Sequence, residues 1–136
     1  MTVLKVNTDG GAKGNPGPAS IGVVFYINNK KIFQHHSPIG VATNNDAEYQ
    51  ALIFALNEIK KEKEKLVNKH KIEKIDFYSD SNLLVNQVNG LFKIKNGKIK
   101  EYVLKIKILE QEINLPIYYH HIPREKNQEA DRLVNF

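Results

Sequence analysis

Five short segments of the chain have the mixture of apolar and polar side chains that is typical of β-strands. In each segment the apolar side chains either alternate with polar ones or run together over a few residues. A Gly/Pro-rich turn and then Asn28-Asn29 separate the first three segments, which favours an antiparallel meander. We predict strands over residues 2–8, 20–28, 31–37, 74–79 and 117–122.

Capping residues and apolar side chains three and four positions apart predict four helices. Asn44-Asn45-Asp46 offers N-caps for the first helix, and the charged run over residues 60–65 is its solvated end. A basic turn over residues 92–100 leads into the third helix. The four helices are expected over residues 46–61, from Ser81 to Gly90, from Ile99 to Leu109, and from about Asn127 to Phe136.

The resulting order, βββαβααβα, combines a meander with helical crossovers. Crossovers make strands parallel and place helices on both faces of the sheet, so we expect an α/β fold with a five-stranded mixed sheet. The first and fourth strands would lie side by side, which places Asp9 and Asp80 next to each other at their carboxyl ends. Open α/β sheets bind their ligands at that edge.

Length and composition narrow the class of protein. A chain of 136 residues is the size of one domain, which we expect to span residues 1–136. The chain has no Cys, which excludes disulfides, zinc–thiolate sites and thiol chemistry. Its apolar runs are too short to span a bilayer, and the N-terminus has no signal-peptide pattern. We therefore expect a cytoplasmic monomer with no membrane association.

The formal net charge is +5, from 20 Lys and Arg against 15 Asp and Glu. If four carboxylates were committed to metal ions, the rest of the chain would carry +9 (5 plus 4). Such a surface suits a polyanion such as nucleic acid. A chain rich in Asn, Ile and Lys is basic in any case, so the charge alone does not identify the partner.

Four acidic residues, Asp9, Glu48, Asp80 and Asp131, stand at positions that indicate a shared site. Asp9 and Asp80 follow apolar runs, and Glu48 lies one helical turn before Leu52 on the buried face of its helix. Carboxylates about 4 Å apart repel by about 4 kcal/mol at an effective dielectric of about 20, so a cluster needs counter-charge. Two divalent ions would balance the four charges, and oxygen ligands suit Mg²⁺ or Mn²⁺. The alternative gives each acid a local role as a turn cap or helix residue.

The motifs around these acids resemble those of the type 1 ribonuclease H family, from residue 3 to residue 134. A lone Asp-Gly-Gly would be weak evidence, whereas four motifs in order are strong evidence. They are Asp9-Gly10-Gly11 with Gly14-Asn15-Pro16-Gly17, then Asn44-Asn45-Asp46-Ala47-Glu48, then Ser79-Asp80-Ser81, and finally His121-Ile122-Pro123-Arg124-Glu125 with Asn127 and Ala130-Asp131.

The resemblance implies a ribonuclease H-like fold and an endonuclease that cuts the RNA strand of RNA–DNA hybrids. It implies two Mg²⁺ ions, replaceable by Mn²⁺, on Asp9, Glu48, Asp80 and Asp131, and products with 5′-phosphate and 3′-hydroxyl ends. Two other functions stay open: a non-catalytic module that binds hybrid or duplex, and another polynucleotidyl transferase on the same fold. The short chain argues against the transferase, and the presence of all four acids argues against the binding module.

The resemblance also implies substrate contacts at neutral residues beside the acids. Glycines let a nucleic-acid backbone come close, although the same residues also make a hairpin turn. Asn44 could equally serve only as an N-cap. The expected substrate-binding residues of this group are Gly10, Gly11, Asn15, Thr43, Asn44 and Asn45.

A basic turn that carries Lys93, Lys95, Lys98 and Lys100 occupies the region where many relatives have a longer basic protrusion that grips the DNA strand. This version is short and has no Trp. We expect these lysines to contact the substrate, the alternative being a charged loop without contact.

Arg124 and His121 compete for an auxiliary catalytic role. Many relatives use a His on a flexible loop, whereas His-Ile-Pro-Arg-Glu resembles a branch in which an Arg replaces that loop. Pro123 stiffens the chain before Arg124, which favours the arginine. His121 is the second candidate.

Overall fold

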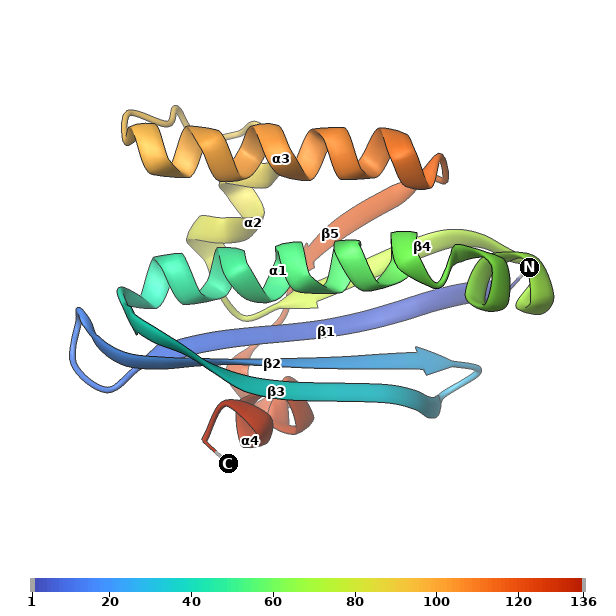
Figure 1. The fold of residues 1–136 in the computed structure, drawn as a ribbon, viewed down its shortest axis with the longest axis horizontal. Coiled ribbons are helices and arrows are strands. Elements are labelled where there is room, and N and C mark those ends of the chain that lie inside the picture. Colours follow the sequence, from blue (N-terminus) through green and yellow to red (C-terminus); the bar gives the residue numbers. More distant parts are fainter. Residues whose placement is uncertain (1, 136) are drawn as a thin grey trace.

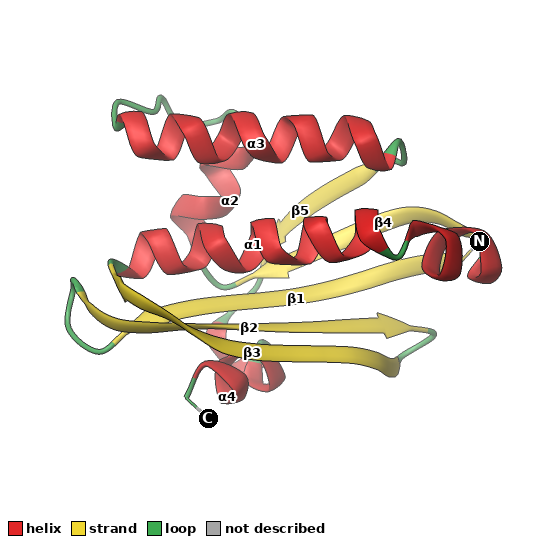
Figure 2. Ribbon diagram, in the orientation of Figure 1, coloured by secondary structure: helices red, strands yellow, loops and turns green. Residues whose placement is uncertain are grey.

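A computed structural model of the chain describes residues 2–135. Its five strands form one sheet in the order β3-β2-β1-β4-β5 (Figures 1 and 2). β1 pairs antiparallel with β2 and parallel with β4; β2 pairs antiparallel with β3, and β4 parallel with β5. The predicted mixed five-stranded sheet and the order βββαβααβα are confirmed. The strands are β1 Thr2–Ala12, β2 Gly17–Ile27, β3 Lys30–Ala42, β4 Ile72–Ser79 and β5 Ile117–His121.

The helices lie on both faces of the sheet, as the crossovers require. Figure 1 shows α1, α2 and α3 on one side of the strands and α4 on the other. Among the described residues, no helix is both long and apolar enough to cross a membrane. The α-helices are α1 Asn44–Lys61, α2 Asn82–Val88, α3 Gly97–Ile113 and α4 Gln128–Val134.

Each face of the sheet has an apolar core, and a third, small cluster joins Ala19, Ala42 and Ala47. The larger core lies between the sheet and α1 to α3, and its fully buried side chains include Phe25, Leu56 and Ile106. The smaller core joins Val24 of β2 to Ala130 and Leu133 of α4. A helix as short as α4 has little stability by itself. Its apolar packing on β2 and the hydrogen bonds of the preceding Asn127 therefore hold it in place.

Several predicted boundaries differ from the structure. β1 continues three residues past Asp9, because the antiparallel pairing with β2 extends to Ala12↔Ala19. Thr43, not Asn44, Asn45 or Asp46, caps α1: its side chain accepts a hydrogen bond from the Asp46 amide, and Asp46 completes a capping box. The two local hydrogen bonds of this capping box set the start of the helix. The predicted cap at Ser81 is confirmed by its bond from the Leu84 amide.

Two short helical turns were not predicted. A π-helical turn, η1 Glu64–Asn68, follows α1, and a 3₁₀ turn, η2 Arg124–Lys126, precedes α4. The charged run over residues 60–65 is therefore split between the end of α1 and η1. The last helix ends at Val134, and the predicted extension to Phe136 lies outside the described residues.

Candidate active site

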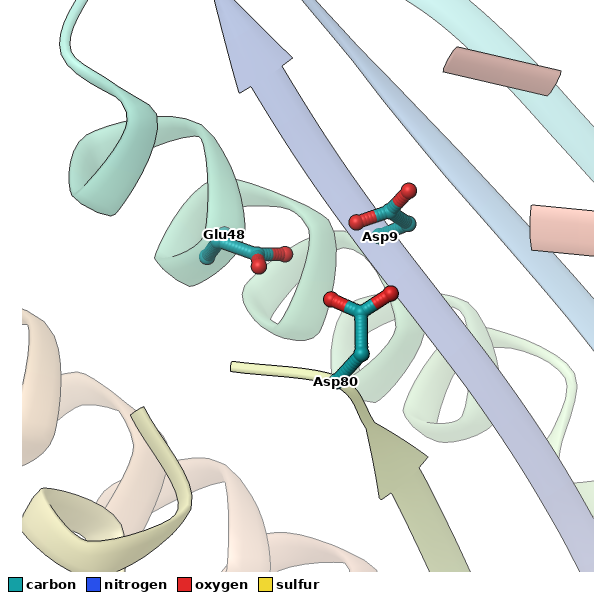
Figure 3. Close-up of side chains that lie close together, drawn as sticks. All are labelled: Asp9, Glu48 and Asp80. Atoms are coloured by element: carbon teal, nitrogen blue, oxygen red, sulfur yellow. The ribbon is translucent and has the colours of Figure 1, made fainter. Parts of the chain in front are cut away.

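Three carboxylates from three different elements converge. Asp9 lies in β1, Glu48 in the second turn of α1, and Asp80 directly after β4. Each offers one oxygen, and these atoms all lie within 4.8 Å of one another. Figure 3 shows the three side chains pointing toward a common centre. Asp9 and Glu48 are buried, with exposed fractions of 6% and 8%, so neither behaves as ordinary surface acid.

The backbone around Gly10 fixes two of these groups. The Gly10 amide donates hydrogen bonds to Glu48 Oε1 at 2.8 Å and to Asp9 Oδ1 at 3.0 Å. A Cβ at Gly10 would lie only 2.3 Å from the carbonyl carbon and oxygen of Ala47. Strand β1 and the first turns of α1 thus pack backbone against backbone, which is possible only without a side chain at residue 10.

Asp131, on α4, borders the same cavity, whose volume is about 380 Å³. Asp131 lies close to Asp9. A hydrogen bond between the two carboxyl groups and the negative charge of Asp131 both raise the pKa of Asp9. Its Oδ1 also accepts a hydrogen bond from Arg124 Nη2 at 3.2 Å. All four predicted acids therefore line one cavity, with three in a tight group and Asp131 beside them. The other lining residues are Gly10, Gly11, Ala12, Lys13, Pro18, Ser20, Asn44, Arg124, Val134 and Asn135.

The electrostatics of the cluster favour protonation in the absence of a cation. Burial, followed by the charges of Asp80 and Asp131, raises the pKa of Asp9 to about 8. Burial and the charges of Asp9 and Asp80 likewise raise the pKa of Glu48 well above its usual value. The hydrogen bond from Gly10 opposes both shifts but is the weaker effect. A divalent cation bound here would offset the repulsion among these carboxylates and favour their ionised forms.

The donor set fits a hard divalent cation. Its contacting atoms are carboxylate oxygens, which Mg²⁺ and Mn²⁺ prefer over softer ligands. Lys13 and Arg124 are the basic residues on the cavity wall, and Arg124 is already paired with Asp131. The buried carboxylates are thus consistent with divalent metal use, with Asp9, Glu48 and Asp80 as the nearest possible ligands.

The neutral residues predicted to contact substrate are partly assembled at this cavity. Gly10, Gly11 and Asn44 line it. Asn44 Oδ1 accepts a hydrogen bond from the Ala12 amide at 2.8 Å, and Asn15 Oδ1 accepts one from the Asn44 amide at 2.9 Å. Asn44 therefore ties the end of β1 to the start of α1. Thr43 serves as the helix cap, and Asn45 lies in the first turn of α1 away from the cavity wall.

The basic turn is exposed and touches α1 through one residue. Lys93 and Lys95 lie in the exposed segment between α2 and α3. Lys98, in the first turn of α3, forms an ion pair with Asp46 Oδ2 at 3.4 Å. Lys98 therefore lies beside the helix end that carries Glu48, and it already has a protein partner.

The two auxiliary candidates differ in position. Arg124 lines the cavity and binds Asp131. His121 is an exposed residue of β5 and is not among the lining residues. Its neighbour His120 points to the other face, where it bonds to Asp76 at 2.9 Å and stacks on Tyr78. The geometry supports Arg124 as the auxiliary residue, and its role stays a prediction.

Sequence reasoning missed residues that border or support the cavity. Lys13, Ser20 and Asn135 line it, and Asn135 Nδ2 donates to the Asp131 carbonyl at 2.9 Å. Behind the cavity, the buried Asn127 donates to Asp80 Oδ2 at 3.4 Å. Asn127 belongs to a recognised motif, but its contact with Asp80 depends on tertiary packing that no sequence pattern shows.

Comparisons with known proteins show what this chain is similar to. A family model described as reverse transcriptase-like matches residues 7–136. The "Bifunctional protein Rv2228c" of Mycobacterium tuberculosis is 34% identical over 132 residues, which are 96% of this chain and 34% of that protein. This chain thus spans about a third of the length of the curated relative.

Two solved structures cover nearly the whole chain. The crystal structure of "LC11-RNase H1 in complex with RNA/DNA hybrid" has a TM-score of 0.89 and 41% identity, covering 97% of this chain and 94% of that one. "RNase H1 from halophilic archaeon Halobacterium salinarum NRC-1" has a TM-score of 0.84 and 29% identity, covering 98% and 95%. The likeness therefore includes both the sheet and the elements that carry the acids.

Proposed function

Because this chain belongs to the type 1 ribonuclease H family, we propose that it is a divalent-metal-dependent endonuclease that cuts the RNA strand of RNA–DNA hybrids. The observation that carries the proposal is the convergence of Asp9, Glu48 and Asp80 within 4.8 Å, with Asp131 in the same cavity. The crystallised relative that holds an RNA/DNA hybrid supports the choice of substrate. The expected products carry 5′-phosphate and 3′-hydroxyl ends.

The four acids would hold two divalent ions, Mg²⁺ with Mn²⁺ as a substitute. When bound, such a pair of ions activates the attacking water and neutralises charge on the leaving 3′-oxygen. Asp9, Glu48 and Asp80 provide most of the negative charge that attracts the ions, and the Gly10 amide holds the Glu48 carboxylate in place. Asp131, on α4, completes the set from the wall of the same cavity.

Neutral and basic residues would position the hybrid. Gly10 and Gly11 offer a wall without side chains, so a nucleic-acid backbone can come close to the acids. Asn44 lies on the same wall, and its side-chain Nδ2 can donate to a phosphate or a ribose hydroxyl. The exposed Lys93 and Lys95 would contact phosphates beyond the cavity.

Arg124 would act through charge and position. A guanidinium keeps its proton near neutral pH, so Arg124 cannot serve as a general base. Its hydrogen bond to Asp131 orients that carboxylate, and its remaining donors are free to approach a phosphate oxygen. His121 would take the auxiliary role only if β5 or η2 moved toward the cavity.

One assay tests the proposal. The full chain is incubated with labelled RNA–DNA hybrid, double-stranded RNA, double-stranded DNA and single-stranded RNA, each with Mg²⁺, Mn²⁺ or EDTA. We expect cleavage of the RNA strand in the hybrid, with either metal and not with EDTA. Cleavage that persists in EDTA would overturn the metal requirement. Binding without cleavage would favour the non-catalytic module, and DNA strand transfer would favour the transferase.

The proposal also includes a monomeric enzyme that acts in the cytoplasm. Light scattering on the purified protein tests the oligomeric state, and a fluorescent fusion in its host tests the location. A stable dimer would contradict the monomeric state, and a fusion confined to a membrane would contradict the cytoplasmic location. Neither result would bear on the proposed catalytic activity.

A further inference from the structure

The buried residue Asn127 contacts, through its side chain and its backbone, the segments that carry three of the four acids. Its exposed fraction is 1%. Nδ2 donates to the carbonyl of Thr8, the residue before Asp9, at 3.0 Å, and to Asp80 Oδ2 at 3.4 Å. Its backbone carbonyl oxygen accepts a hydrogen bond from the Asp131 amide at 3.0 Å. The residue therefore links β1, the end of β4 and the first turn of α4.

A second contact comes from a glycine in the interior of β2. Gly22 pairs with Asp9 across the antiparallel ladder. A Cβ at Gly22 would lie 2.5 Å from the carbonyl oxygen of Ala130 and 2.9 Å from Leu133 Cβ. The backbone of α4 thus rests directly on the strand at the residue opposite Asp9. Glycine inside a strand often marks such a close approach.

We propose that Gly22 and Asn127 are positioning residues of the active site, which fix helix α4 on the sheet and so hold Asp131 opposite Asp9. This inference rests on the proposed function, because it assigns the docking of α4 to the metal-binding set. Neither residue reaches the cavity wall, and neither would contact a substrate there.

The docking matters because few other contacts fix the Asp131 carboxylate. Its Oδ1 is held by Arg124, whose side chain is 75% exposed, and approached by Asn135 at 3.5 Å. α4 is only seven residues long. A shift of the helix would therefore move Asp131 directly, whereas Asp9, Glu48 and Asp80 are carried by β1, α1 and β4, elements that face the larger core.

Substitution at the two positions separates docking from catalysis. Gly22→Ala places a methyl group against the α4 backbone and should displace the helix. Asn127→Ala removes the bonds to Thr8 and Asp80; Asn127 makes no side-chain cap bond to α4, so the start of the helix stays intact. We expect both variants to fold and to bind Mn²⁺ about 10–100-fold more weakly, the range found when partners of metal ligands are lost. Calorimetric titration with Mn²⁺ alone measures this without substrate.

Three control variants separate a loss of stability from a loss of Mn²⁺ affinity. Gly97→Ala adds a methyl group where nothing lies within 4 Å, and should match the wild type. Asn7→Ala removes the 3.0 Å bond from Asn7 to Asn127 but leaves the contacts with Thr8 and Asp80. Leu109→Ala opens a cavity in the larger core, away from α4. Asn7→Ala and Leu109→Ala should lower the melting temperature while Mn²⁺ affinity stays near that of the wild type.

A crystal structure of Gly22→Ala gives the second readout. We expect α4 and Asp131 displaced, with β1, α1 and β4 unmoved. The inference is overturned if α4 keeps its place, if Mn²⁺ affinity is unchanged in both variants, or if Leu109→Ala weakens Mn²⁺ binding as much as they do. If Gly22→Ala does not fold, the outcome for Asn127→Ala decides. A wild type that binds Mn²⁺ but leaves the hybrid intact would overturn the proposed function and leave the docking inference standing.

Discussion

The amide of Gly10 and the carboxylate of Glu48 form a 2.8 Å hydrogen bond that joins β1 to α1 at the site. The bond exists because Gly10 has no Cβ, which would lie 2.3 Å from the backbone of Ala47. One position therefore controls both the distance between two elements and the orientation of one acid. We therefore expect that even the addition of one methyl group at Gly10 disturbs the site.

Gly10→Ala should destabilise the protein and abolish cleavage together. The added methyl group forces β1 and α1 apart, and overpacking of this kind costs about 1–3 kcal/mol. Urea unfolding and hybrid cleavage measure the two effects. Gly11→Ala is the matched control for stability, because its Cβ would meet only Val134 Cγ1 at 3.4 Å. Equal stability of the two variants would show that the strand–helix contact is not tight.

The metal-free protein should lose stability as pH rises. The pKa of Asp9 is raised to about 8 in the folded protein, from an ordinary value of 3.8. A raised folded-state pKa contributes stability that is fully present below pH 3.8 and is lost as pH rises through about 8. Glu48, whose pKa is also raised, acts with the same sign.

Urea unfolding in EDTA across this pH range tests the prediction. Asp9→Asn is the control, because it removes the Asp9 titration and relieves the repulsion on Glu48. We expect the variant to have a flatter pH profile and, above neutral pH, greater stability than the metal-free wild type. Wild-type stability that rises from pH 5 to pH 8 more steeply than that of Asp9→Asn would contradict the raised pKa of Asp9.

The basic turn should govern binding more than the chemical step. Replacing Lys93, Lys95 and Lys100 with Ala should raise KM far more than it lowers kcat. Each lost phosphate contact should reduce the slope of log affinity against log salt by about 0.7–0.9.

Lys98 needs a separate test because of its ion pair with Asp46. Lys98→Ala and Asp46→Asn both break that pair, but only Lys98→Ala removes a cation. A salt slope that changes in neither the three-lysine variant nor Lys98→Ala would show that the turn is only a charged loop.

Arg124 should matter more than His121. We predict that Arg124→Ala lowers kcat at least about tenfold, equivalent to about 1.4 kcal/mol, because Asp131 loses its 3.2 Å hydrogen bond and the site loses a positive charge. His121→Ala should cost clearly less, since His121 lies outside the cavity wall. Rate measurements across pH 5–9 check the assignment. If His121→Ala were the more harmful and removed a rate step near pH 6–7, the histidine would be the auxiliary group.

The sequence was sufficient to predict the fold and the gathering of the acids, for physical reasons. Strand and helix periodicities are local, and the right-handed crossover then places β4 beside β1. Asp9 and Asp80 therefore had to lie close together. Glu48 followed from its place one turn before Leu52 on the buried face of α1.

The contacts that fix the acids could not be predicted. Gly10 and Gly11 indicate a turn, yet they continue β1 because β2 pairs with them as far as Ala12. The roles of Gly22 and Asn127 depend on how α4 packs on the sheet. Lys98 was expected to contact substrate, and its ion pair with Asp46 depends on how α3 packs beside α1. In each case the deciding partner is distant in sequence.

The most direct test of the account compares the wild type with Asp9→Asn on a labelled RNA–DNA hybrid in saturating Mg²⁺. The substitution keeps the size of the side chain and removes one charge from the group of Asp9, Glu48 and Asp80. Circular dichroism first confirms that both proteins are folded. We predict rapid cleavage of the RNA strand by the wild type and almost none by Asp9→Asn. A variant that retains a substantial share of wild-type activity would contradict a metal-binding role for Asp9 and, with it, the proposed centre.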